Sequence, residues 1–309
     1  MDTKKFNIVG IGEILWDIYE NKKFLGGAPA NFAIHCQQLG NTGIIASRIG
    51  NDELGREVVN SLHKRQLESN YIQLDFDKPT GTVKVNLDKN GNPQFECTTD
   101  VAFDYLQLDS KLSQLAHHSD AILFGTLAQR NDRSRETIQK FLKLSVRAFK
   151  IYDINLRGWN KKIKEIVNQS LILADAIKLN DDELYILRSA GQPGTDNIAF
   201  LKYMISEHNL KFAALTLGED GCILVEPDEI VEHKGIKIRP IDTTGCGDAF
   251  AAALIHYYLR GKSLKEIAAL SNLLGAYVAL FPGATPQYST AELARFKDSE
   301  LNKLPILSN

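Results

Sequence analysis

The stretch IDTTGCGDAFAAALIHYYLRG, residues 241–261, joins a glycine-rich turn to an alanine-rich segment. The three small residues 245–247 are followed at once by Asp248 and an apolar run, which predicts a helix that ends near Gly261. The first turn of such a helix has N–H groups without intrahelical partners and carries the positive end of the helix dipole. Small side chains there let a phosphate approach closely. The stretch therefore predicts an anion-binding turn with one carboxylate inside it.

Asp248 has two interpretations from the residues alone. As a general base it would accept a proton from a substrate hydroxyl, an effect that typically accelerates a reaction by roughly 10²–10⁴-fold. As a structural residue it would only complement the helix dipole, while the glycines close a tight turn. A single glycine-rich turn does not decide between the two.

Outward from this stretch, short apolar runs alternate with longer helical patterns. The runs contain many β-branched residues and lie at 6–12, 43–50, 121–125, 149–155, 176–180 and 212–218. Helical patterns, for example 132–149 and 196–209, stand between most of them. Such alternation predicts an α/β fold, with a mostly parallel central sheet covered by helices on both faces.

Two segments interrupt this alternation, 15–27 and 71–98. Both look like strands joined by turns, and the second contains a hairpin signal, DKNGNP at 88–93. We expect the two segments to pair as a small sheet that covers a ligand cleft as a lid, and a surface hairpin without that role is the alternative. The α/β core would then comprise residues 1–14, 28–70 and 99–309.

Composition argues against several classes of protein. The net charge of the 309 residues is −2, so no basic surface is expected for nucleic acid or an anionic membrane. The four cysteines lie far apart without C-x-x-C spacing, which argues against a zinc site and a disulfide framework. No apolar stretch approaches the length of a membrane span or a signal peptide. We expect a soluble, cytoplasmic protein without nucleic-acid or membrane partners.

A second glycine pair stands in FLGGAPANFAIHCQQLG, residues 24–40. Pro29 suits the first position of a helix, and Asn31 then lies beside the helix start. Its amide offers both a donor and an acceptor, which match the hydroxyls of a polyol. An ordinary glycine–proline helix entry explains the stretch equally well.

Two more motifs follow predicted strands. In KLNDDEL (178–184), Asn180 and Glu183 can cap a helix, or in a nucleotide enzyme they can hold water around Mg²⁺. In TLGEDGCILV (216–225) the glycines can simply close a turn, or the loop can cradle a phosphate or ribose at the carboxyl ends of parallel strands.

These four motifs, in this order, resemble the ribokinase-like (PfkB) family of sugar and nucleoside kinases. GGAPANFA is similar to the family's N-terminal signature and DTTGCGDAF to its C-terminal signature, with NDDE and TLGEDG at the expected places between them. The resemblance extends from the first strand to FPGATP at 281–286. It implies a ribokinase-like three-layer α/β sandwich, mostly parallel in its central sheet, with a small β-sheet lid.

The resemblance also implies roles for the residues of the C-terminal signature. Asp248 would be the catalytic base for the primary hydroxyl of the sugar. The N–H groups of Gly245, Cys246 and Gly247 would form the hole for charge on the transferring phosphoryl group. A thiol at a helix N-terminus can have a lowered pKa and so be open to oxidation, although an inert filler is the favoured interpretation of Cys246.

Other positions would hold the two substrates and the ions. Asp17, Gly27 and Asn31 would bind sugar hydroxyls. The residues expected in the nucleotide pocket are Asn180, Thr216, Gly218, Gly221 and Asn272. The residues expected near ions are Glu183, which with Asn180 would organise Mg²⁺ through water, and Asp242 and Thr244, which resemble positions for a monovalent cation, usually K⁺.

Within the family, GGAPAN, GEILWD (12–17) and DINLR (153–157) look most like fructokinases. Arg157 is then a candidate for phosphate or sugar contact, and a surface charge at a helix start is the alternative. The resemblance implies ATP-dependent phosphorylation of D-fructose to fructose 6-phosphate. The alternatives are a kinase for 2-keto-3-deoxygluconate, ribose or a nucleoside, and a non-catalytic sugar-binding regulator. Exposed lid strands also make a homodimer an expectation.

Overall fold

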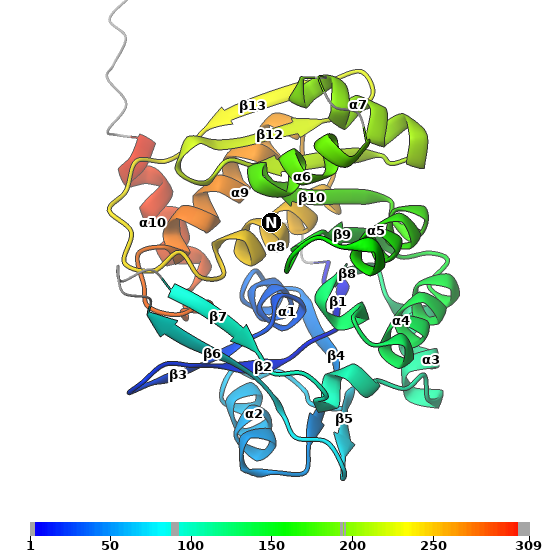
Figure 1. Ribbon diagram of the computed structural model, residues 1–309. Coiled ribbons are helices and arrows are strands. Elements are labelled where there is room, and N and C mark those ends of the chain that lie inside the picture. The colour runs from blue at the N-terminus through cyan, green and yellow to red at the C-terminus, as the bar shows by residue number, and fades with distance from the viewer. Residues whose placement is uncertain (1–3, 88–92, 192–193, 195, 302–309) are drawn as a thin grey trace, which may run out of the picture.

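The computed structural model describes residues 4–87, 93–191, 194 and 196–301, and within them one large sheet organises the chain (Figure 1). Its nine strands have the order β13-β12-β11-β10-β9-β8-β1-β4-β5. The strands from β5 to β11 in this order pair in parallel, and β12 and β13 extend the sheet antiparallel at one edge. These strands are β1 (Asn7–Ile11), β4 (Thr42–Gly50), β5 (Ile72–Asp75), β8 (Ala121–Gly125), β9 (Phe149–Asp153), β10 (Ala176–Asn180), β11 (Phe212–Thr216), β12 (Gly221–Val225) and β13 (Ile230–Lys234).

Central strands of the sheet are apolar on both faces. In β8, Ile122 and Phe124 join one hydrophobic cluster while Ala121 and Leu123 join another. Because side chains alternate across a strand, the two clusters lie on opposite faces of the sheet. The six apolar runs of the sequence therefore form buried strands of a parallel sheet, as expected from their lack of polar alternation.

Helices cover both faces. The helices α3, α4, α5, α6 and α7 contribute to the first cluster, and α1, α8, α9 and α10 contribute to the second. The helices are α1 (Ala28–Gln38), α2 (Glu53–Lys64), α3 (Ser110–His118), α4 (Asp132–Leu144), α5 (Lys161–Leu173), α6 (Asp181–Gly191), α7 (Asn197–His208), α8 (Cys246–Tyr258), α9 (Leu264–Val278) and α10 (Thr290–Leu301). Three short 3₁₀ helices are η1 (Ala102–Tyr105), η2 (Leu127–Gln129) and η3 (Gly218–Asp220).

A second, smaller sheet has the order β3-β2-β6-β7. Its strands are β2 (Leu15–Ile18), β3 (Lys23–Gly26), β6 (Gly81–Leu87) and β7 (Pro93–Cys97). β2 and β6 pair in parallel, so the two interrupting segments of the sequence do form one sheet. The start of the second segment differs from the expectation, because β5 pairs with β4 and so belongs to the large sheet. Residues 88–92 of the DKNGNP signal lie outside the described residues.

Among the contacts that hold the small sheet, two mark its extent. Trp16 of β2 is buried and donates an indole hydrogen bond of 3.0 Å to the carbonyl of Leu54 in α2. At the other side, the ring of Phe24 in β3 lies against Gly283, where an added Cβ would come within 2.8 Å of a ring carbon. The small sheet therefore spans from α2 to the loop that follows α9.

Candidate active site

The first turns of α1 and α8 meet in the middle of the molecule, where the two helices pack together (Figure 1). The side-chain nitrogen of Asn31 in α1 donates a hydrogen bond of 2.8 Å to Asp248 Oδ2 in α8. The Oδ1 atom of Asn31 is buried and has no hydrogen-bond partner in the structure. Asn31 and Asp248, both expected to face the substrate, are thus brought together. The Oδ1 atom of Asn31 is a buried acceptor that can still receive a hydrogen bond from a ligand.

The turn before Asp248 has the geometry of an anion site. Gly245 is in the left-handed conformation with φ 77°, and a Cβ there would lie 2.5 Å from the side chain of Ala284. The N–H of Cys246 already donates a long bond of 3.3 Å to the carbonyl of Thr243. The N–H groups of Gly247 and Asp248 come next in the helix, where no carbonyl of the preceding turn can accept them. They are the best-placed donors for an anion.

The thiol of Cys246 differs from the expectation of a lowered pKa. Burial, followed by the negative charges of Asp248 and Asp242, raises the pKa of this thiol to about 12. It is therefore a neutral thiol at physiological pH, with little of the thiolate that oxidants and alkylating agents attack. The interpretation of Cys246 as a small filler is favoured.

The carboxyl group of Asp248 is strongly perturbed. Burial and then the charge of Asp153 raise its pKa to about 7, against the opposing effects of Lys178, the Asn31 amide and Arg157. A carboxylate with such a pKa accepts a proton from an alcohol better than an ordinary surface aspartate does. This environment fits the expected role of Asp248 as a general base, which stays a prediction here.

Lys178 and Asp153 are close to this turn. They begin the motifs KLNDDEL and DINLR, but the sequence analysis gave neither of them a role. They stand side by side on β10 and β9, and the ammonium of Lys178 lies 3.1 Å from each carboxylate oxygen of Asp153. A Cβ added to Gly247 would lie 2.9 Å from Lys178 Nζ. The signal in the sequence was a charged residue inside the otherwise apolar strand AIKLN.

Glu13 is a third residue to which the sequence analysis gave no role, although it lies within GEILWD. It is only 2% exposed, and its Oε2 atom has no hydrogen-bond partner. Burial raises the pKa of Glu13 to about 7; the charge of Arg157 and the N–H groups of Glu13 and Ala28 lower it, and the charge of Asp248 raises it further. The carboxyl group of Glu13 is thus within electrostatic range of Asp248.

The charged side chains of Asp17 and Arg157 interact electrostatically. Burial raises the pKa of Asp17 to about 6, the charge of Arg157 lowers it, and the charge of Asp242 raises it. Arg157 is itself exposed, and its guanidinium lowers the pKa of Asp17, Glu13 and Asp248. Its position next to these acids favours a functional role over that of an isolated surface charge.

Gly27 determines how the chain enters α1. It has φ 104°, and a Cβ there would collide with the backbone carbonyl of Glu13. Pro29 follows within the first turn of the helix, as the sequence predicts. Gly27 therefore allows the start of α1 to approach the backbone between β1 and β2 closely. This packing requirement accounts for the glycine whether or not its backbone also contacts a sugar.

Asn180 and Glu183 form a reciprocal cap at the start of α6. The N–H of Glu183 donates to Asn180 Oδ1 at 2.8 Å, and the N–H of Asn180 donates to Glu183 Oε2 at 2.9 Å. Glu183 Oε1 accepts the N–H of Leu156 at 2.8 Å. Each carboxylate oxygen keeps a further lone pair, so Glu183 fits contact with Mg²⁺ through water better than direct bidentate ligation. The cap also ties the DINLR loop to α6.

The remaining residues expected around the nucleotide fall into two groups. Thr216 ends β11, and Gly218, at φ 57°, has open space where a Cβ would point. Gly221 instead faces the neighbouring strand β13, where a Cβ would collide with the carbonyl of His233. The side-chain nitrogen of Asn272 lies 2.9 Å from His233 Nδ1. Packing explains Gly221 and Asn272, whereas Thr216 and Gly218 remain open to a ligand.

Asp242 fastens two loops together. Its Oδ1 accepts the N–H of Thr244 and its Oδ2 accepts the N–H of Gly283, both at 2.9 Å. Burial pushes the pKa of Asp242 upward, but these backbone donors lower it overall. The carboxylate is therefore ionised, and it holds the turn before α8 against the loop after α9.

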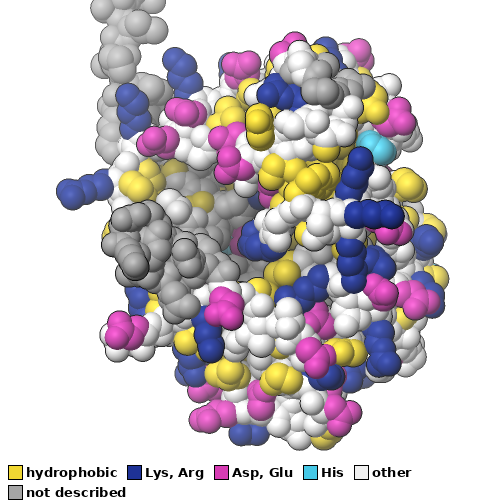
Figure 2. Space-filling view, viewed as in Figure 1, with side chains coloured by type: hydrophobic (Ala, Val, Ile, Leu, Met, Phe, Trp, Pro, Cys, Tyr) yellow, Lys and Arg dark blue, Asp and Glu magenta, His cyan; other side chains and the backbone are white. Residues whose placement is uncertain are grey.

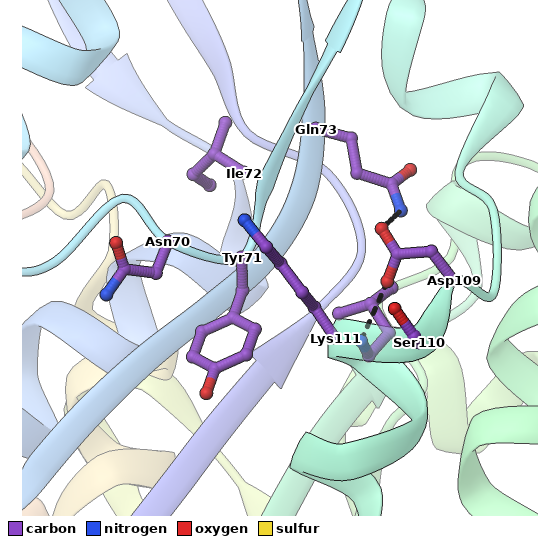
Figure 3. Close-up of a pocket in the computed structure, with 8 residues that line it drawn as sticks. Asn70, Tyr71, Ile72, Gln73, Asp109, Ser110 and Lys111 are labelled. Atoms are coloured by element: carbon purple, nitrogen blue, oxygen red, sulfur yellow. Dashed lines mark hydrogen bonds between the residues drawn. The ribbon is translucent and has the colours of Figure 1, made fainter.

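Two surface pockets lie away from these residues. One, of about 210 Å³, is lined by residues 70–73 and 109–112, and Asp109 there already caps α3 and accepts a bond from Gln73 (Figure 3). The other, of about 400 Å³, lies among α1, α2 and the start of α10. On the face shown in Figure 2, basic and acidic side chains are interspersed. None of the helices in the described part of the chain is long and apolar enough to span a membrane.

Fold and site together define a phosphotransferase that acts on an alcohol group. The chain belongs to the pfkB family of carbohydrate kinases, which matches residues 12–291. It is an ATP-dependent sugar kinase, and its ribokinase-like α/β fold is as expected.

Relatives that carry different kinase names match nearly the whole chain. PH1459 of Pyrococcus horikoshii, an uncharacterized sugar kinase, is 29% identical over 311 residues, covering 94% of this chain and 96% of its own. Its crystal structure in complex with ATP matches with a TM-score of 0.81, covering 94% of this chain and 98% of that one. Fructokinase-2 of Solanum lycopersicum is 28% identical, covering 93% of this chain and 94% of its own. The ATP-dependent 6-phosphofructokinase of Thermoanaerobacterium thermosaccharolyticum is 27% identical, covering 92% and 91%.

Proposed function

We propose that the protein transfers the γ-phosphoryl group of ATP to the primary hydroxyl of D-fructose, with Asp248 as the general base. The observation that carries this proposal is the carboxyl group of Asp248 in the first turn of α8, bonded to Asn31 and with its pKa raised to about 7. The base and the anion-binding amides lie in one helical turn. A single loop therefore meets both the alcohol and the phosphoryl group.

Charge at the sugar side favours a neutral acceptor. The charge of Asp248 raises the pKa of Glu13, and the charge of Asp242 raises the pKa of Asp17. Arg157 lowers the pKa of Glu13, Asp17 and Asp248. A phosphosugar or a sugar acid would add a negative charge to this acid-rich region, which is costly where desolvation is substantial. Fructose adds none. The likeness to fructokinase-2 of Solanum lycopersicum supports a fructose acceptor. The similar likeness to a 6-phosphofructokinase makes fructose 6-phosphate a necessary member of the acceptor panel.

The proposed mechanism assigns one role to each group. Asp248 takes the hydroxyl proton as the sugar oxygen attacks phosphorus, and the bond from phosphorus to the bridging oxygen of ADP breaks. The N–H groups of Gly247 and Asp248 donate to the transferring group, whose charge is spread over its outer oxygens. Mg²⁺ bound with ATP would supply further charge neutralisation, and Asn180 and Glu183 would orient its water shell. The positive charge of Arg157 would partly neutralise the negative charges of Glu13, Asp17 and Asp248.

Sugar hydroxyls would be held from α1 and from the small sheet. Asn31 Oδ1 is buried and unpartnered, so a hydroxyl donor would satisfy it. Asp17 lies on β2 of the small sheet, and its movement toward the core would close the site. A closed sheet excludes water that would otherwise hydrolyse ATP.

An acceptor panel tests the proposal. Purified protein is given ATP and, separately, fructose, ribose, 2-keto-3-deoxygluconate, a nucleoside or fructose 6-phosphate, and ADP release is followed. The highest kcat/KM is expected for fructose, with the phosphate found on the 6-hydroxyl by NMR. A higher kcat/KM for another acceptor rejects fructose. Fructose binding without turnover on any acceptor would instead indicate a sugar-binding regulator.

Three further proposals concern the surroundings of the enzyme. First, Asp242 and Thr244 would lie near a bound K⁺ ion. If so, kcat should rise when Na⁺ in the buffer is replaced by K⁺. The edge strands β3 and β7 of the small sheet would pair two copies into a homodimer, which light scattering checks. A cytoplasmic location is proposed from the sequence and is checked by fractionation of the source cells.

A further inference from the structure

Lys178 and Asp153 form an ion pair that is buried beside the anion-binding turn. They are paired residues on the parallel strands β10 and β9, with 7% and 1% of their surfaces exposed. The sheet face around them is otherwise lined by apolar residues such as Ile151 and Ala176. A buried ion pair costs several kcal/mol of desolvation per charge and is often less stabilising than apolar packing. Its presence here calls for a role other than stability.

The ammonium of Lys178 has donor capacity left over. Its two hydrogen bonds, both of 3.1 Å, go to the same carboxylate, that of Asp153. An ammonium has three N–H donors, and no third acceptor for it is found among the residues that the structure describes. A third donor therefore remains for an atom that enters the site.

Geometry places this donor at the anion-binding turn. A Cβ added to Gly247 would lie 2.9 Å from Lys178 Nζ and 3.6 Å from its Cε. The absence of a side chain at position 247 thus lets the ammonium approach the backbone of the turn. The same glycine supplies one of the free N–H groups, so an anion bound there would meet the ammonium as well.

The charges around Lys178 keep it protonated. Burial lowers the pKa of the ammonium, but the negative charges of Asp153, Glu183 and Asp248 raise it overall. The ammonium in turn lowers the pKa of Asp248 and of Glu183. Lys178 therefore lies within electrostatic range of both the base and the residue that would orient the metal.

We propose that Lys178 is a further catalytic residue, whose ammonium donates a hydrogen bond to the phosphoryl group during its transfer, while Asp153 fixes the position of that ammonium. The sugar oxygen forms its bond to phosphorus, the proton passes to Asp248, and ADP leaves with the electron pair of the broken P–O bond. Lys178 keeps its proton throughout and only stabilises charge. This inference rests on the proposed role of Asp248 and not on the identity of the sugar.

The test compares Lys178→Met with the double variant Lys178→Met/Asp153→Asn. The single variant leaves a buried, unpaired carboxylate and is expected to be less stable, whereas the double variant has no buried charge at this place. In both variants kcat should fall roughly 100-fold or more, as on removal of a donor from an oxyanion hole. The KM for the acceptor should change less than threefold. A double variant that folds and keeps kcat within threefold of the wild type overturns the proposal.

A binding measurement separates catalysis from structure. ADP with aluminium fluoride and the sugar mimics the transferring phosphoryl group, and such mimics bind in proportion to transition-state stabilisation. The double variant should bind this combination roughly 100-fold more weakly than the wild type, while its affinities for ADP and for the sugar alone are kept. Equal affinity for the mimic contradicts the role of Lys178.

Lys150→Met serves as the matched control. Lys150 is on β9, the strand of Asp153, and is partly buried. It lies 4.0 Å from another aspartate, Asp175, toward the opposite end of the strand. Its replacement should leave kcat unchanged. If the wild type phosphorylates a sugar other than fructose, the fructose assignment fails, and the comparison of Lys178 variants is made with that sugar.

Discussion

Asn31 and Asp248 are separated by 217 residues in the sequence, yet the amide nitrogen of one lies 2.8 Å from a carboxylate oxygen of the other. An ionised carboxylate only accepts hydrogen bonds, so the contact turns the Asn31 nitrogen toward Asp248 and its oxygen away. That oxygen is buried without a partner. The two signature motifs are therefore linked by one bond that orients both an acceptor for the sugar and the proposed base.

The first prediction concerns Asn31→Asp, which keeps the size of the side chain and replaces the donor by a second carboxylate. Repulsion should raise the pKa of Asp248 further. At pH 7, kcat/KM should fall at least tenfold, with partial recovery at pH 9, as followed by ADP release. Asn160→Asp is the control, because Asn160 caps α5 and aspartate caps equally well. An unchanged pH profile in Asn31→Asp would contradict the proposed coupling.

The second prediction concerns pH. Asp248 has its pKa raised to about 7, and only its ionised form can accept the hydroxyl proton, so kcat/KM should rise as the pH increases through about 7. Glu13 and Asp17 have pKa values raised to about 7 and about 6, so the rise should be broader than for a single group.

The Asp248→Asn variant provides the comparison for this profile. It should lose roughly 10²–10⁴-fold in kcat, because the general base is gone. Its residual rate should no longer rise across the same pH range. The affinity for the sugar, measured by calorimetry, should change little. A variant with normal turnover would rule out Asp248 as the base.

Local patterns were enough to predict most of the large sheet. The apolar runs at 121–125 and 176–180 match β8 and β10 residue for residue, because fully buried parallel strands have a distinctive composition. β5 was assigned to the small sheet, since Ile72–Asp75 alternates polar and apolar residues as an edge strand does. β12 was not foreseen, because its residues follow turn glycines that suggested a loop. β13 was not foreseen either, because it is a short edge strand with polar and charged residues.

The site was less accessible to sequence reasoning where it depends on register. Lys178 and Asp153 are neighbours because β9 and β10 pair with these two residues opposite each other. Nothing in either strand alone specifies that pairing. The environment of Glu13 likewise arises from its burial in the folded chain, next to the N–H of Ala28 at the start of α1. The sequence motifs identify residues in turns. Lys178, Asp153 and Glu13 instead lie in strands or directly after them.

The third prediction concerns Glu13→Gln. Glutamine keeps the size of the side chain but removes a carboxylate whose pKa is raised by the charge of Asp248. Because like charges repel each other mutually, removal of this charge should lower the pKa of Asp248. The ascending limb of the pH profile should therefore shift to lower pH, with kcat at pH 8 within a few-fold of the wild type. Glu13→Ala, in contrast, should raise the KM for the sugar. If Glu13→Gln leaves the limb in place, Glu13 is not coupled to the base.

The last prediction compares two glycines in the same backbone conformation. Gly245 has φ 77° and Gly261 has φ 66°, so alanine at either position costs about 1–2 kcal/mol in left-handed strain. At Gly245 the new Cβ would also lie 2.5–2.6 Å from atoms of Ala284, whereas at Gly261 nothing lies within 4 Å.

Gly245→Ala should therefore lose more stability in urea unfolding than Gly261→Ala. It should also lose kcat. To avoid the collision with Ala284, the turn at 245–247 has to move, and its N–H groups would then no longer be positioned for the phosphoryl group. Gly261→Ala lies at the other end of α8 and should keep its kcat while losing only the strain energy. Equal losses of kcat in the two variants would mean that backbone strain, and not the contact with Ala284, sets the geometry of the turn.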